Sequence, residues 1–566
     1  MEQRYLYRHN PVVKKIFLSM LAPTILMNLT TAIGSMADTV IIGHYLDDLS
    51  LSVVTFATPI YMVINTFAAL FAVGGCIAMS IDSGKGEKEN ANRAYSVSML
   101  MLALTGAVLL LTGVFFSAPI THWLGAGEDI FASVETYSKI ILVGAPVFVL
   151  NIGLAFFVRN DGRPTLSMVG MFASIVVDII LNVVFVGMMD MGVSGAAYST
   201  VLGQLVSIII IASHFLSSRN TLKFRFTFDS TAFRIIKNGG SSALHFVYQF
   251  VTILIINHFL SKLAGTNGVV IYTVVFNLST VSLSVFEGIS QTLQPMISNY
   301  FGEKSYKNIS ETLRLAFITV VIICGSVTLL LEIFPETVPV VFGIEDGSLI
   351  QQSAAAVRIY AVSMIITTVN VVIGYYLQSI EQTFTATVMI SLRNLVLFLG
   401  ATVILGKLFG MNGVWAAYTV AEVMAFAICL LMLRIKQKKS SKSGTKTNIL
   451  LLEEETGKGI NCYTFSFTQD ETDTYIKTVS EKLNFSPEIK EDVSLDALAY
   501  LRALSKCSVS KKRRFIETEI NSAAKKVIIR DNLDHSAIKN EIETLLSDAS
   551  NADYSPVLGW NRICLE

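Results

Sequence analysis

The chain has 566 residues, 52% of them hydrophobic and only 15% charged, whereas about a quarter of the residues of a soluble globular protein are charged. The 43 Lys and Arg residues balance the 43 Asp and Glu residues, so no basic excess indicates a nucleic-acid partner. Before residue 440, apolar runs long enough to cross a bilayer alternate with short polar breaks. This composition excludes an ordinary soluble protein and predicts an integral membrane protein, with the lipid bilayer as its surroundings.

The first residues read MEQRYLYRHNPVVKK, a polar stretch without the small-residue cleavage site of a secretory signal peptide. We therefore expect no removable leader. The six cysteines follow neither a zinc-binding nor a disulfide spacing, and we expect them to be reduced and either buried or incidental. They are Cys76, Cys324 and Cys429 in apolar runs, and Cys462, Cys507 and Cys564 in the polar tail.

Apolar runs such as 94–117, 166–186, 316–331 and 392–405 are predicted membrane spans. Lys and Arg gather in every second polar break, and cytoplasmic loops collect these residues. The alternation places both ends of the membrane region in the cytoplasm, which requires an even number of spans, and twelve fit. One expected cytoplasmic turn, 379–383, has no basic residue. The basic breaks lie at 4–15, 85–93, 159–163, 219–237, 304–314 and 434–439.

Short patterns recur along the chain at offsets of 216, 218 and 214 residues, each at the same place in its half. Since each half holds an even number of spans, the pattern predicts parallel repeats about an axis along the membrane normal, as in secondary transporters whose substrate site lies between the halves. The expected fold is an all-α membrane protein of twelve transmembrane helices in two parallel six-helix repeats. The matched positions are Gly86-Glu87-Lys88 with Gly302-Glu303-Lys304, Gly192 and Gly195 with Gly410 and Gly413, and His44-Tyr45-Leu46 with His258-Phe259-Leu260.

Two aspartates lie within predicted spans of the first half. Asp38 lies in the first span and Asp178 in the fifth, with Asn182 one helical turn after Asp178 and Ser174 one turn before it. Ionisable side chains inside a bilayer are costly and indicate function by default. A carboxylate there can exchange a proton, or it can hold Na⁺ together with hydroxyl and amide oxygens. The alternative is a structural polar contact that joins two helices.

The second half offers a different set of polar residues. Arg393 and Glu422, in the last two spans, fit either a packing ion pair or a transport role, and Glu287, in the eighth span, fits either a cavity or the cytoplasmic surface. The position equivalent to Asp178 falls on Arg393 or Asn394, so we expect cation coupling in the first half. We expect the scattered histidines to be solvated or to serve packing. The candidates for the substrate cavity are Glu287, Gln291, Gln294, Asn151, Arg393 and Glu422.

Residues 11–435 resemble the multidrug and toxic compound extrusion (MATE) transporters. The segment at spans eight and nine is the most specific, with Gln294-Pro295 followed by Asn299-Tyr300-Phe301-Gly302. The segments that carry the resemblance are ADTVIIGHYLDDLSLSVVTFATPI, VRNDGRP, SIVVDIILNVVFV, MGVSGAAYSTVLGQ and FEGISQTLQPMISNYFGEK.

This resemblance implies two six-helix bundles facing each other in a V, and export of organic cations by proton or sodium antiport. It places the coupling cation on Asp38 and Asp178. Some family members use an acid in the tenth span, but here that span reads IYAVSMIITTVNVVIGYYLQ, with no acid. The resemblance therefore gives no second-half coupling site in this chain.

The composition changes after Lys439, where a basic Ser/Gly linker leads to a soluble α+β segment. That segment resembles the histidine-kinase-like ATPase fold of anti-sigma kinases, whose Asp-x-Gly strand end reads adenine and matches VIIRDN at 527–532. Leu533 replaces the glycine and 495–504 contains no Asn for magnesium, which argues against ATP hydrolysis. We interpret the segment as a regulatory or pairing module that would contact a protein partner, with an inert appendage as the alternative. The expected domains are 1–220 and 221–436 (the six-helix bundles), 437–449 (the linker) and 450–566 (the cytoplasmic degenerate ATPase-like domain).

The leading hypothesis is a secondary active efflux transporter, not an enzyme, in a bacterial cytoplasmic membrane with both termini in the cytoplasm. It would exchange small organic, often cationic and amphipathic, compounds for a proton or Na⁺ by alternating access, with no cofactor besides that ion. No G-x-x-x-x-G-K-[ST] sequence occurs, which disfavours a nucleotide-driven motor. The alternatives are a lipid-linked oligosaccharide flippase, which would need a basic cavity around Arg393, and a membrane sensor that signals through its C-terminal domain.

Overall fold

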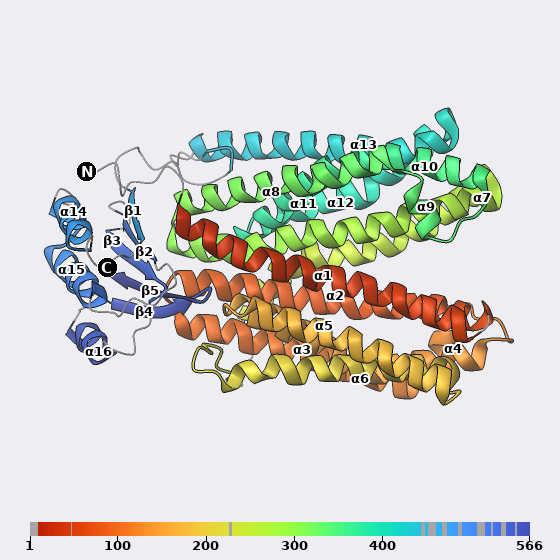
Figure 1. The fold of residues 1–566 in the computed structure, drawn as a ribbon, viewed down its shortest axis with the longest axis horizontal. Helices are drawn as coiled ribbons and strands as arrows, with labels where there is room; N and C mark the ends of the chain where they lie inside the picture. The colour runs from red at the N-terminus through yellow and green to blue at the C-terminus, as the bar shows by residue number, and fades with distance from the viewer. Residues whose placement is uncertain are drawn as a thin grey trace.

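The computed structural model describes a long helical bundle with a small sheet domain packed against one of its ends (Figure 1). We call the sheet domain the C-terminal domain, and the end of the bundle that it contacts the tail side. The described residues are 10–46, 48–225, 229–442, 448–450, 460–466, 472–484, 489–505, 515–521, 525–533, 539–548 and 552–565.

The first half of the bundle consists of helices whose apolar runs form membrane-length segments. Pro11 and Pro164 each occupy a first helical turn, where a missing N–H costs nothing. The side chain of Asn10 accepts from the N–H of Val12 and caps the first helix. This half comprises α1 (Pro11–Tyr45), α2 (Asp48–Gly84), α3 (Lys88–Trp123), α4 (Phe131–Asn160), α5 (Pro164–Asn182), the π-helix η2 (Val183–Met188), α6 (Gly192–Ala212) and the 3-10 helix η3 (Ser213–Leu216).

The second half lies beside the first and runs from green to cyan in Figure 1. Its longest helix contains two membrane-length segments, Thr231–Leu260 and Val270–Glu303. The last helix is broken at Gly410, whose φ of 62° lies in the left-handed region that glycine tolerates. This half comprises α7 (Thr231–Glu303), α8 (Tyr306–Ile333), α9 (Thr337–Val341), α10 (Gly347–Ala361), α11 (Ser363–Ser379), α12 (Thr383–Ser391), the π-helix η4 (Leu392–Val396) and α13 (Leu397–Lys442).

The described residues contain ten helices long and apolar enough to cross a membrane, or eleven when α10 and α11, bent by 42°, count as one span. The stretch Thr383–Ser441 has 59 residues, enough for two crossings of about 20 residues each. The expected turn at 379–383 separates α11 from α12. Instead of a basic residue it carries Glu381, whose Oε1 lies 2.7 Å from Nε of Arg234.

The two halves meet most extensively along α2 and α7, a contact that we call the seam. Small residues allow helix backbones to approach closely inside membranes. A Cβ added to Gly74 would meet the backbone of Ile235, and one added to Gly239 would meet the carbonyl of Leu70. Near the tail-side ends of the same helices, Gly84 and Asn299 make a contact of this kind. The seam is therefore closed backbone against backbone on the tail side.

Helix α1 connects the two halves. Its first turns belong to the largest apolar cluster, which lies mostly in the second half, and Ile25 packs on Gly288 of α7. Further along, Gly34 of α1 packs on Ile175 of α5 in the first half. A change in the position of α1 therefore acts on both halves.

In the described part of the C-terminal domain, five strands form a sheet in the order β1-β2-β3-β5-β4, with every neighbouring pair antiparallel. One face packs on three helices through apolar residues such as Ile520, Ile529 and Ile563. The other face carries charged side chains and turns toward the bundle. The elements are β1 (Ile460–Ser466), α14 (Thr472–Asn484), α15 (Glu491–Ser505), β2 (Phe515–Asn521), β3 (Lys526–Asp531), α16 (Lys539–Asp548), β4 (Ala552–Val557) and β5 (Trp560–Leu565).

Several predictions about segments and cysteines can be placed on this fold. Helix α13 extends to Lys442, so the first six residues of the predicted linker are helical, and 443–447 lie outside the described residues. Cys507 and the side chain of Cys462 also lie outside them. The other four cysteines are free and buried: Cys76, Cys324, Cys429 and Cys564.

Candidate functional site

Asp38 of α1 and Asp178 of α5 are brought together by one amide. The side-chain nitrogen of Asn182 donates to Oδ1 of Asp38 at 2.9 Å and lies 3.4 Å from Oδ1 of Asp178. Asn182 is fully buried and Asp178 is 6% exposed. Asp178 lies 14 residues from the tail-side start of α5, about 21 Å along the helix axis, which is deep inside a membrane-length segment. We call these three residues the first-half cluster.

The first-half cluster has oxygen atoms available for a cation. Oδ1 of Asn182 is buried and has no hydrogen-bond partner among the described residues. The hydroxyls of Ser199 and Thr200, on α6, lie beside the Asp178 carboxylate. Carboxylate, amide and hydroxyl oxygens are the donors that hard cations prefer, and the same carboxylates can accept a proton.

Ser174 is buried one turn before Asp178. Its backbone carbonyl packs against Gly203 of α6, whose missing side chain lets α5 and α6 approach, while Asn182 joins the two carboxylates. A part of Ser174 in cation coupling stays a prediction. Two phenols missed in the sequence, Tyr61 and Tyr137, lie with their hydroxyls 3.2 Å apart near the aspartates. No spacing rule points to them, because they come from α2 and α4.

The second half holds its own polar groups around the π-helix η4. Nε of Arg393 lies 2.6 Å from Oε1 of Glu422, and the amide of Asn370 donates to Oε2 of Glu422 at 2.6 Å. This ion pair is buried. Nε2 of His245 lies 3.8 Å from Oε1 of Glu287.

Glu287 does not reach the tail-side surface, which was one of its two predicted placements. It lies 16 residues before the tail-side end of α7, about 24 Å along the helix axis. The other expectation for the second half, that His245 serves packing, fits its 2.8 Å hydrogen-bond distance to Asn394. In the first half, His214 lies 2.6 Å from Oδ2 of Asp161 at a helix end.

The amide candidates do not form one site. Asn151 donates to Gln204 within the first half. Gln291 of α7 crosses to the first half, where its Oε1 accepts from Nη1 of Arg159 at 2.8 Å. Gln294 is fully buried, and its side-chain atoms have no hydrogen-bond partner among the described residues.

The environment of Arg159 differs from the one expected for a residue of a basic break. The sequence places it in a solvated cytoplasmic loop, but it is fully buried and lies over the ring of Phe156 at 4.4 Å. It is the last but one residue of α4, and its guanidinium extends back to Gln291 across the halves. Counting basic residues in the polar breaks does not distinguish a buried arginine from a solvated one, because both follow the end of an apolar run.

Comparison with known proteins assigns the chain to a family. The MatE family model matches residues 23–184 and again residues 241–404, which together exceed half of the chain. The chain belongs to the MatE family. The two MatE matches begin 218 residues apart. The first includes Asp38, Asp178 and Asn182, and the second includes Glu287 and Arg393 but ends before Glu422.

Curated MatE relatives include the multidrug export protein MepA of Staphylococcus saprophyticus, 24% identical over 449 residues, which cover 77% of this chain and 97% of that protein. MepA of Staphylococcus aureus strain MRSA252 is 22% identical over 445 residues, with the same coverage of both chains. These alignments leave nearly a quarter of the present chain unmatched.

Solved MatE structures share the fold of the bundle. A multidrug resistance MATE family transporter of the MOP superfamily in its outward-facing conformation has a TM-score of 0.72 at 20% identity, and covers 76% of this chain and 97% of its own. The Vibrio cholerae MATE transporter VcmN, in a mutant form, has a TM-score of 0.70 at 18% identity, with 78% and 99% covered. Both confirm the membrane-transporter fold predicted from the sequence.

The resemblance of the C-terminal domain to histidine-kinase-like ATPases stays a prediction, and the MatE matches end before this domain. Asp531, the residue matched to the adenine-reading aspartate, is fully buried. Its Oδ1 accepts from the N–H of Leu533 and from the amide of Asn561, both at 2.9 Å, and its Oδ2 accepts from the hydroxyl of Tyr500 at 3.2 Å. These contacts give Asp531 a structural role in holding α15, β3 and β5 together.

Proposed function

We propose that this MatE protein is a secondary active transporter that exports small organic compounds from the bacterial cytoplasm in exchange for a proton or Na⁺. The observation that carries the proposal is the first-half cluster, in which Asn182 links the carboxyls of Asp38 and Asp178. The family match and the relatives named as multidrug export proteins support it. Organic cations that are amphipathic are the expected cargo, because buried carboxylates favour positive charge and the surrounding helices are apolar.

The first-half cluster would couple cation and cargo through α1. Two carboxylates that share one amide repel each other, and a bound proton or Na⁺ would remove that repulsion and draw α1 toward α5. Because α1 also packs on α7 through Ile25 and Gly288, this movement would bias the position of the second half. A cargo cation would compete for the same negative charge, so the two would bind in alternation.

The proposed topology has twelve spans in two parallel repeats, with the tail side in the cytoplasm. The ten membrane-length helices become twelve crossings when α10 and α11 count as one further span and 383–441 is divided at Gly410. The doubled MatE match supports the repeat. Basic breaks at 85–93, 159–163 and 304–314 adjoin the C-terminal domain, which supports a cytoplasmic tail side.

The two alternative functions have less support. A flippase for an anionic lipid-linked sugar would need a free cation around Arg393, but Glu422 neutralises that guanidinium. A sensor that signals through nucleotide binding would need Asp531 to be accessible, but it is buried and engaged. We therefore place the proton- or sodium-coupled exporter ahead of both.

Transport in proteoliposomes tests the proposal. Purified protein would be reconstituted and given a fluorescent organic cation under an imposed proton or sodium gradient. We expect gradient-driven movement in the wild type, its loss in Asp38→Asn, and its retention in Asp129→Asn, which removes the same charge from an exposed loop. Equal transport by Asp38→Asn and the wild type would reject the first-half cluster as the coupling site.

A further inference from the structure

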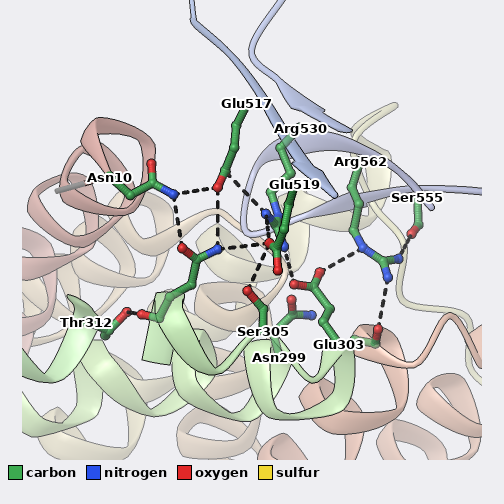
Figure 2. Close-up of polar contacts among 12 residues, drawn as sticks. Asn10, Asn299, Glu303, Ser305, Thr312, Glu517, Glu519, Arg530, Ser555 and Arg562 are labelled. Carbon is green, nitrogen blue, oxygen red and sulfur yellow. Dashed lines mark hydrogen bonds and ion pairs between the residues drawn. The ribbon is translucent and has the colours of Figure 1, made fainter. Parts of the chain in front are cut away.

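The charged face of the C-terminal sheet is buried against the bundle (Figure 2). Side chains alternate between the two faces of a strand. On β2, β3 and β5 one set of positions, which includes Ile520, Ile529 and Ile563, covers the helices of the domain, and the other set, which includes four charged residues, faces the bundle. None of these four charged residues is more than 3% exposed. Charges buried to this degree need partners. The four are Glu517, Glu519, Arg530 and Arg562.

Partners come first from the second half, at the tail-side end of α7. Oε1 of Glu303 lies 2.8 Å from Nε of Arg562, and its Oε2 accepts from Nη2 of Arg530. The hydroxyl of Ser305 donates to Oε2 of Glu519 at 2.9 Å. Glu303 is fully buried and sits between the two arginines (Figure 2).

Other contacts come from the first half. Nη2 of Arg562 donates to the backbone carbonyl of Gly84, the last residue of α2, at 2.9 Å. Nζ of Lys88 lies 2.8 Å from Oδ1 of Asp553. Two glycines also meet at this interface: Gly162, which follows α4, and Gly559, in the turn before β5. Their φ angles are 83° and 80°, and a Cβ on Gly162 would overlap the backbone of Gly559.

Arg562 therefore touches three parts of the protein at once. It lies against Glu303 of the second half and Gly84 of the first half, and its Nη1 lies 3.0 Å from Oδ2 of Asp553 in its own sheet. Helix α1 also contacts the C-terminal domain, because Nζ of Lys15 lies 4.6 Å from the ring centre of Phe515 in β2. The C-terminal domain thus spans the tail-side ends of both halves across the seam.

We propose that the C-terminal domain is a clamp that holds the two halves together on the tail side and thereby restrains transport. The inference rests on the proposed transport cycle, in which the tail-side ends part to admit cargo. When the two halves part on the tail side, Gly84 moves away from Glu303. Arg562 would then have to lose its contact with one of these two residues. Losing a partner from a buried charge network is far more costly than breaking a surface pair, so the domain must release one half before the seam opens.

The distance between the two halves tests the clamp directly. Spin labels would be attached in the full-length chain to Thr165→Cys, at the exposed start of α5, and Lys307→Cys, at the exposed start of α8. Cys462 and Cys507 would be replaced by serine, since the other four cysteines are buried. Double electron–electron resonance would then be measured in lipid nanodiscs for Arg562→Gln and for Glu303→Gln, which alters no residue of the C-terminal domain.

Arg225→Gln is the matched control, because the Arg225–Glu89 ion pair is exposed and joins α3 to the segment that connects the two halves. We expect both clamp variants, but not the control, to increase the long-distance population by about tenfold and to raise the rate of transport of the organic cation. Distance distributions like those of the wild type in both variants would overturn the proposal, as would an equal effect of Arg225→Gln. Long distances without movement of any compound under either gradient would support the clamp and reject the proposed transport function.

Discussion

Arg234 of α7 forms an ion pair with Asp82 of α2, in which the one nitrogen Nη1 lies 2.8 and 2.9 Å from the two carboxylate oxygens. The pair crosses the seam between the halves. The same guanidinium places Nε 2.7 Å from Glu381, in the turn between α11 and α12. These contacts lie inside the bundle, so they close the tail side independently of the C-terminal domain.

Breaking this pair should loosen the tail side. We expect Arg234→Gln to destabilise the closed arrangement by about 1–2 kcal/mol, less than for a fully buried pair because the Arg234 side chain is 30% exposed. The alkylation rate of a thiol at Ser80→Cys, a buried position on α2, should then rise about tenfold from the tail side. An unchanged alkylation rate would show that the glycine contacts and the C-terminal domain close the seam without this ion pair. Glu89→Gln, which removes an exposed partner on the same side, should leave the rate unchanged.

Replacing both members of the Arg393–Glu422 pair by uncharged residues would show whether the pair serves packing or transport. Removing one partner alone, as in Arg393→Gln, should cost about 3–5 kcal/mol because it leaves a buried charge unpaired. The double change Arg393→Met with Glu422→Met should cost far less. Thermal unfolding in detergent measures these differences. If the double variant is stable and still transports, the pair serves packing; a stable but inactive double variant would assign it to transport.

Two adjacent glycines provide a steric test of the seam. A Cβ at Gly239 would run into the backbone carbonyl of Leu70, whereas a Cβ at Gly240 meets open space. We expect Gly239→Ala to prevent full closure and to lower the thermal unfolding temperature. Gly240→Ala should be neutral or slightly stabilising, by up to about 1 kcal/mol from helix propensity. Equal unfolding temperatures for the two variants would contradict the close packing of α2 on α7.

The clamp should weaken as the pH rises. In the docked state, burial raises the pKa of Glu519 above its ordinary 4.5, the negative charges of Glu517 and Glu303 raise it further, and Arg530 opposes them. Released from the bundle, Glu519 would return toward its ordinary pKa, so the docked form binds the proton more tightly. Docking is therefore strongest below the ordinary pKa and is lost progressively as the pH rises through the raised value.

The same spin-label pair measures this effect from about pH 4 to about pH 8, a window that begins near the ordinary carboxyl pKa and extends above it. We expect the long-distance population to grow toward high pH in the wild type. Glu519→Gln, which resembles the protonated side chain, should remove most of the dependence. A dependence that persists unchanged in Glu519→Gln would assign it to another group, with Glu303 and Glu517 as the nearest acids.

The sequence was sufficient for the membrane class and the family, because apolar runs, basic breaks and the motif around Gln294-Pro295 are local signals. The meeting of Asp178 with Asn182 follows from their spacing of one helical turn. The contact of Asn182 with Asp38 does not follow from spacing, since it depends on α1 lying beside α5.

The clamp could not be read from the sequence for a physical reason. Alternating Glu residues at 517 and 519 predict a strand with one polar face, and such a face is ordinarily solvated. Glu303 stood out only as part of a repeated Gly-Glu-Lys pattern. In the structure its counterpart Glu87 accepts from Asn90 on the surface, whereas Glu303 is buried under the C-terminal domain. The local sequence pattern predicts the same environment for Glu87 and Glu303. Their environments differ only because the C-terminal domain docks on Glu303.

The glycine contacts of the seam also have an entropic consequence. At Gly74, Gly84, Gly239 and Gly302 the helices meet without a side chain from the glycine position, so closing the seam there freezes no rotamers of those residues. Opening releases correspondingly little side-chain entropy, and the open and closed arrangements are kept close in free energy at these positions. Such a surface can part and close again without searching for a packing arrangement, and the ion pairs beside it then decide which state is populated.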